Sequence, residues 1–157
     1  MSNMIKFITL TQPWATLVAL GVKRIETRSW RTPYRGLLGI HAAKSYPDWA
    51  REFARRDPQC RAALEAAGEH WDTLTLGEIV AVTELRNCIR TEELVVTLSE
   101  GERAFGNYEP GRWAWVLGET VAIEGHTPHR GSLGLWETDP YLAELFEQYY
   151  REGVPGR

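Results

Sequence analysis

A lysine, a glutamate and an arginine stand close together in residues 21–28, which read G-V-K-R-I-E-T-R. Lys23 and Glu26 are three residues apart, and Arg28 follows two residues later. In a cleft, such a Lys–Glu pair can bind a base edge, because the carboxylate accepts from an exocyclic amine and the ammonium donates to a carbonyl. The pair can also transfer protons where desolvation lowers the pKa of the lysine. The alternative is a surface salt bridge worth under about 1 kcal/mol.

Arginines and aromatic residues alternate directly after this pair. Arg28, Arg31 and Arg35 offer planar guanidinium groups, which bind phosphate through two hydrogen bonds at once. Trp30 and Tyr34 lie between them and can stack a base for roughly 1–3 kcal/mol each where they are exposed. Core packing is the alternative for Trp30. We predict that these five residues belong to a nucleic-acid or nucleoside site.

Three later residues complete the predicted binding set. His41 faces away from the apolar side of its predicted strand, Lys44 follows that strand, and Arg112 begins a later strand. The alternative for His41 is a structural histidine. No Ser-His-Asp or Cys-His set is visible in the sequence. If the protein is an enzyme, Lys23 and Glu26 are the predicted catalytic residues, because a lysine beside a carboxylate can transfer protons.

The net charge of −3 conceals an uneven distribution. Residues 1–60 hold ten Lys or Arg and four Asp or Glu, which makes this part +6 and the remainder −9. An acidic protein can still present a basic face to phosphate. Because aromatic residues interleave with these bases, we predict a nucleic-acid-binding face in this part of the chain. The alternative is surface charge that falls unevenly by chance.

Composition limits the class of protein. A chain of 157 residues, 43% hydrophobic and 25% charged, fits one globular domain with a single core. No apolar run approaches the roughly 18 residues of a membrane span, and residues 1–6 lack a signal region. We therefore expect a cytoplasmic protein in which Cys60 and Cys88 are reduced thiols. The spacing of Cys and His predicts no metal site, and we expect no cofactor.

Hydrophobic patterning predicts short strands separated by helices and loops. Strands are expected at residues 5–10, 22–28 (extended), 37–43, within 77–87, 112–117 and 133–136. Helices are expected at residues 13–20, at 47–68 with a break at Pro58, briefly within 94–106, and at 141–150. The apolar stripe of the last helix is predicted to be Leu142, Leu145, Phe146 and Tyr149. Without a regular βαβ alternation, this order predicts a small barrel with peripheral helices.

Several sequence blocks in a fixed order resemble ASCH domains. The segment at residues 21–28 matches G-x-K-x-x-E-x-R, preceded by L-T-Q-P-W-A and followed by S-W-R-T-P-Y-R-G and I-H-A-A-K. P-G-R-W-A-W-V-L and R-G-S-L-G-L-W come later, so the resemblance spans residues 10–136. It implies an α+β, mainly β fold, a PUA-like small β-barrel with flanking α-helices. We expect this domain at 4–137, with a helical insertion at about 47–68, and a C-terminal helix and tail at 138–157 packed on it.

The resemblance also implies what the domain does. ASCH domains are regarded as RNA-binding modules, and some members are hydrolases of acetylated cytidine or of RNA. The amidohydrolases carry a threonine nucleophile three residues after the signature lysine, where this chain has Glu26. We therefore expect an RNA- or modified-nucleoside-binding module, with a hydrolase acting on RNA or on a modified base as the alternative. A third possibility is self-association through the aromatic helix at 141–150, and the sequence leaves the oligomeric state open.

Overall fold

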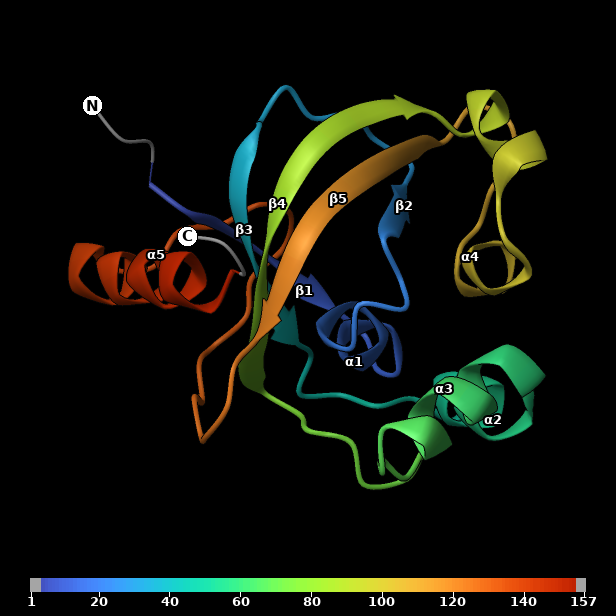
Figure 1. The fold of residues 1–157 in the computed structure, drawn as a ribbon, viewed down its shortest axis with the longest axis horizontal. Coiled ribbons are helices and arrows are strands. Elements are labelled where there is room, and N and C mark those ends of the chain that lie inside the picture. Colours follow the sequence, from blue (N-terminus) through green and yellow to red (C-terminus); the bar gives the residue numbers. More distant parts are fainter. Residues whose placement is uncertain (1–3, 155–157) are drawn as a thin grey trace.

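Five strands form one continuous sheet that curls into a half-barrel in the computed structural model, which describes residues 4–154 (Figure 1). The strands are β1 (Lys6–Leu10), β2 (Ile25–Arg28), β3 (Gly36–Ala42), β4 (Glu78–Arg90) and β5 (Trp113–Ala122). Their order is β1-β3-β4-β5-β2, with β1 parallel to β3 and the other pairs antiparallel. The predicted mainly β fold with flanking helices is confirmed. The barrel remains open between its two edge strands, β1 and β2.

Helices cover both sides of the sheet. They are α1 (Trp14–Ala19), α2 (Asp48–Arg56), α3 (Pro58–Ala66), α4 (Glu100–Phe105) and α5 (Pro140–Gly153), with the 3₁₀ turns η1 (Thr91–Glu93) and η2 (Val95–Thr97). Figure 1 shows α5 on one side of the sheet and α1 to α4 on the other. The predicted break at Pro58 is confirmed, because α3 begins there and the Asp57 side chain accepts from the Cys60 N–H at 2.9 Å.

Alternating side chains on β1 enter two separate cores. Ile8 and Leu10 pack inside the half-barrel against α1, whereas Ile5 and Phe7 pack on the opposite side against α5. Gly39 on β3 is required by this second core, because a Cβ there would overlap the Phe7 ring. Side chains thus pack against both faces of the sheet. Its two edge strands, β1 and β2, do not pair with each other.

A third core joins the helices beside the open edge. It contains Leu17 of α1, Ala50 and Ala54 of α2, Leu64 of α3 and Phe105 of α4. This cluster places α2 and α4 next to the end of β1 and the start of β2. α2 and α4 each form a wall of a cleft at this edge.

Two predictions near the C-terminus are wrong. Residues 133–136 do not form a strand, because Gly134 has a φ of +64° and only Trp136 bridges to Phe7. The stripe predicted for α5 is wrong only in part: Phe146 is buried and Leu142 packs against the same core, whereas Leu145 and Tyr149 are 45% and 36% exposed. The other buried residues of α5 are Ala143 and Tyr150. The buried face of α5 is rotated relative to the predicted stripe, because α5 packs on the Phe7 side of the sheet. Among residues 4–154, no helix has the length and hydropathy to span a membrane.

Candidate functional site

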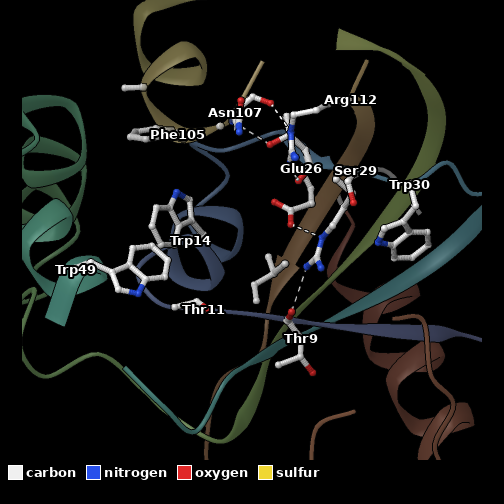
Figure 2. A pocket seen from close by; sticks show the side chains of 15 residues that line it. Thr9, Thr11, Trp14, Glu26, Ser29, Trp30, Trp49, Phe105, Asn107 and Arg112 are labelled. Atoms are coloured by element: carbon white, nitrogen blue, oxygen red, sulfur yellow. Dashed lines mark hydrogen bonds and ion pairs between the residues drawn. The ribbon is translucent and has the colours of Figure 1, made fainter. Parts of the chain in front are cut away.

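A cleft of about 690 Å³ opens where the half-barrel fails to close (Figure 2). Its lining comes from β1 and the turn after it, from β2 and the loop after it, from α1 and α2, and from the end of α4 and the segment between α4 and β5. The lining residues are Thr9, Leu10, Thr11, Trp14, Glu26, Thr27, Arg28, Ser29, Trp30, Trp49, Ala104, Phe105, Gly106, Asn107 and Arg112. Three predicted binding residues, Arg28, Trp30 and Arg112, and the predicted catalytic Glu26 are among them.

Arg28 spans the gap between the edge strands. Its Nε donates to Glu26 Oε2 at 2.9 Å, and its Nη2 donates to the carbonyl oxygen of Thr9 at 3.2 Å. Since β1 and β2 share no backbone hydrogen bonds, this guanidinium links them through a side chain. Much of the charge of Arg28 is therefore used within the protein.

Lys23 is buried beneath the cleft and is absent from its lining. Gly21, with a φ of +77°, ends the helical segment and turns the chain so that Lys23 enters the core. The Lys23 Nζ donates to the carbonyl oxygens of Ile25 (2.5 Å) and Phe105 (3.1 Å) and lies 3.6 Å from Glu26 Oε1. Burial lowers the pKa of Lys23, while Glu26 and Glu102 oppose this change. Lys23 thus ties α4 to β2 and orients Glu26.

Glu26 is held between two cations. One oxygen faces Lys23 and the other accepts from Arg28, and the side chain is 13% exposed. A carboxylate has about four acceptor positions, so each oxygen can accept a further hydrogen bond. Glu26 is therefore a fixed, negatively charged acceptor at the cleft.

Two buried polar groups near this pair were not foreseen. The Glu102 Oε2 accepts from the Arg24 N–H at 2.6 Å, while its Oε1 and the Tyr108 hydroxyl have no hydrogen-bond partner among residues 4–154. Burial raises the pKa of both side chains. Ser99 and Glu102 match the helix-capping pattern S-x-x-E, which predicts only a local role for this glutamate. No spacing in the sequence relates Glu102 to Arg24.

Tryptophans stand on both sides of Glu26 (Figure 2). Trp30 is 36% exposed and meets Trp115 edge-on, with ring centroids 4.8 Å apart. On the other side, Trp14 lies 5.7 Å from Trp49, which is 65% exposed. The repeat of Trp14 with Leu17 at helical spacing predicts a place for Trp14 in the core. It is instead half-buried and lines the cleft, because it stands in the first turn of the short helix α1.

Arg112 forms part of the rim opposite α1. Its Nε donates to the carbonyl oxygen of Asn107 at 3.1 Å, and its Nη2 donates to that of Thr27 at 3.4 Å. The Asn107 N–H in turn donates to Thr27 Oγ1 at 3.0 Å. These bonds hold the segment after α4 against β2. Thr27 and Ser29 also line the cleft.

Five predicted binding residues lie outside the cleft lining. Tyr34 donates its hydroxyl to the Leu37 carbonyl, and Arg35 donates to the carbonyls of Thr32 and Tyr34, so both hold their own loop in place. The three remaining residues are a buried histidine, an exposed lysine and an exposed arginine, namely His41, Lys44 and Arg31.

His41 is enclosed on its own side of β3. Its Nδ1 lies 3.1 Å from Thr9 Oγ1, and its Nε2 lies 2.6 Å from the His129 carbonyl oxygen. Burial lowers the pKa of His41. The expected place of His41 in the cleft wall is wrong, because the segment around His129 covers this face of the strand.

Comparisons with known proteins agree with this architecture. The ASCH domain family model matches residues 8–125. Activating signal cointegrator 1 of Homo sapiens and that of Mus musculus are each 50% identical to the chain over 40 residues. That match covers 26% of this chain and about 7% of the length of either relative.

Solved structures of an ASCH protein from Zymomonas mobilis share the fold. The chain matches that protein with a TM-score of 0.54 and 13% identity, over 96% of each chain. A tyrosine-to-phenylalanine mutant of it matches with a TM-score of 0.55 and 13% identity, over 93% of this chain and 98% of the other. Identity at this level shows the fold alone, whereas the family model covers most of the chain. The chain therefore belongs to the ASCH domain family.

Proposed function

We propose that the cleft binds one base of a single-stranded RNA or of a modified nucleoside. The observation that carries this proposal is a fixed carboxylate, Glu26, with Trp30 on one side and Trp14 and Trp49 on the other. Aromatic side chains stack on any base, and a volume of about 690 Å³ lies within the range of small-molecule sites.

Glu26 supplies base selectivity in this proposal. A carboxylate accepts hydrogen bonds from the exocyclic amine of cytosine, adenine or guanine, and uracil has no such amine. Lys23 does not donate to the base, because its ammonium already faces two carbonyl oxygens and Glu26. Ser29 and Asn107, both exposed at the cleft, can donate to a base carbonyl.

A hydrolase acting on RNA or a modified base is the second candidate. It is favoured by a buried lysine of lowered pKa that lies 3.6 Å from Glu26, since such pairs serve in proton transfer. We rank it second because Lys23 is absent from the cleft lining, which leaves a substrate no direct contact with it.

One screen tests both candidates. The protein and its Glu26→Gln and Trp30→Ala variants are incubated with a panel of standard and modified nucleosides and with a structured RNA. Binding is followed by tryptophan fluorescence, and products by mass spectrometry. Glu65→Gln is the matched control, because Glu65 is an exposed carboxylate paired with Arg61 on α3.

The outcomes separate the candidates. Binding that is weakened in Glu26→Gln and Trp30→Ala, without new products, supports the binding module. New products that disappear in Glu26→Gln support the hydrolase. If no nucleoside or RNA binds or reacts, or if both cleft variants behave like Glu65→Gln, the cleft does not have this function.

A further inference from the structure

We propose that Arg31 and Arg90, which both lie over the indole of Trp113, form a phosphate clamp for the strand whose base enters the cleft. The guanidinium carbon of Arg31 is 5.6 Å from the ring centroid of Trp113, and that of Arg90 is 4.8 Å from it. We call these three residues the Trp113 clamp. The inference rests on the proposed function of the cleft and adds the part of the ligand that lies outside it.

Strand register places the clamp next to the cleft. Arg28 on β2, Trp113 on β5 and Arg90 on β4 are directly opposite one another, so their side chains share one face of the sheet. Glu26 and Trp115 form the next row on that same face. Two residues along a strand correspond to about 7 Å. A nucleotide whose base reaches Glu26 therefore has its backbone close to the clamp.

Arg31 and Arg90 form no ion pair with the described residues. Neither has a carboxylate oxygen within 4.0 Å in the described part of the chain, and the ring of Trp113 is the contact that each makes. By contrast, Arg55 and Arg61 on the helical side pair with glutamates of their own helices. Stacking on an aromatic face fixes a guanidinium while its N–H groups stay available to a phosphate.

Glu92 is an acid whose electrostatic environment includes Arg90. Its pKa is lowered first by its own backbone N–H and that of Gly111, and only then by Arg90. The carboxylate accepts from the Gly111 N–H at 3.2 Å, which holds it at the turn before β5. Two positive groups therefore gather on one ring without direct neutralisation, and an anion relieves their mutual repulsion.

A nucleic-acid strand fits this surface better than an acidic peptide. Phosphates and bases alternate along a nucleic-acid strand. On this face of the sheet, the clamp proposed for a phosphate lies next to the aromatic cleft proposed for a base. Arg112, at the cleft rim, adds a further guanidinium beside the same cleft. The carboxylate side chains of an acidic peptide carry no ring to stack between the tryptophans.

The experiment compares a nucleoside with an oligonucleotide. Binding of free cytidine and of a labelled single-stranded oligocytidylate is measured at several salt concentrations for the wild type and for Arg31→Ala and Arg90→Ala. Arg31→Gln and Arg90→Gln retain part of the stem over Trp113 and guard against loss of folding, which thermal melting checks. Arg55→Ala and Arg61→Ala are the matched controls.

We expect each clamp variant to weaken oligonucleotide binding about fivefold or more at moderate salt. The slope of log affinity against log salt should become shallower by about 0.7 for each lost phosphate contact. Cytidine, which has no phosphate, should bind every clamp variant within about twofold of the wild type. The control variants should leave both ligands unchanged.

Other results overturn one claim or the other. If cytidine binds but the clamp variants leave oligonucleotide affinity and slope unchanged, the clamp is wrong and the cleft proposal stands. If cytidine does not bind while oligonucleotide binding still depends on Arg31 and Arg90, the cleft proposal is wrong and the clamp stands. If a polyglutamate peptide displaces the oligonucleotide at equal charge concentration, the assignment of the clamp to nucleic acid is wrong.

Discussion

Arg28 on β2 donates to the carbonyl oxygen of Thr9 on β1, 3.2 Å away, and so joins the two edge strands of the sheet. The same guanidinium pairs with Glu26, the acceptor that we place under the bound base. One side chain therefore links the two edge strands and, together with Lys23, holds the carboxylate that we propose recognises the base. This relationship changes the role expected of Arg28 from a free phosphate contact to a support of the cleft.

Replacing Arg28 by alanine should destabilise the fold. The variant loses a bond to a carbonyl and a partly buried ion pair, for which we expect the free energy of unfolding to fall by about 1–3 kcal/mol. Urea denaturation measures this change, and Arg28→Lys should recover part of it. An unchanged midpoint in Arg28→Ala would show that the link between β1 and β2 contributes nothing to stability.

Replacing Glu26 by glutamine should alter base preference. Glutamine keeps an acceptor oxygen but loses the charge, so binding of cytidine should weaken by roughly 1–3 kcal/mol while uridine changes little. Isothermal titration of both nucleosides measures the ratio. If Glu26 instead transfers a proton in a hydrolase, turnover should fall by about a hundredfold while binding persists. Equal losses for cytidine and uridine would contradict the recognition of an exocyclic amine.

The stability of the fold should contain a term from His41 that fades in mild acid. Burial lowers the folded-state pKa of His41 below its ordinary value of 6.5. In the window just below pH 6.5 the unfolded chain therefore binds more protons, and the free energy of unfolding falls as the pH falls. The slope from this single group is at most about 1.4 kcal/mol per pH unit.

Urea denaturation of the wild type and of His41→Gln at pH 7.5 and pH 5.5 isolates this contribution. The difference in stability between the two proteins should be larger at pH 7.5 than at pH 5.5. His70→Gln, a change at an exposed histidine, is the matched control. A His41 difference that grows in acid would reverse the assigned direction of its pKa.

Replacing Tyr108 by phenylalanine should cost little or nothing. The Tyr108 hydroxyl is buried without a hydrogen-bond partner in the described part of the chain, so its removal leaves no donor or acceptor there stranded. We expect the free energy of unfolding to stay within about 1 kcal/mol of the wild type or to rise. Denaturant melts measure it. A loss of about 2 kcal/mol or more would mean that this hydroxyl has a stabilising partner.

Local patterns in the sequence were sufficient for much of the fold. Alternation along residues 5–10 and 37–43 predicted β1 and β3, and Pro58 predicted the boundary between α2 and α3. These features follow from backbone geometry, which acts over a few residues, so neighbours in the sequence are enough to reveal them. The spacing of Lys23, Glu26 and Arg28 also indicated a cluster, since a short segment keeps such residues close.

Only the tertiary structure decided what each member of that cluster contacts. The buried ammonium of Lys23 is stabilised by a hydrogen bond to the carbonyl oxygen of Phe105, which is 82 residues away in the chain. Trp49 joins Trp14 at the cleft because α2 packs against α1 in the third core, and no periodicity within either helix encodes that meeting. The sequence by itself determined which residue types stand at residues 21–35. Packing between distant segments determined which of them face the cleft and which support it, because burial and hydrogen-bond partners depend on contacts that local spacing does not specify.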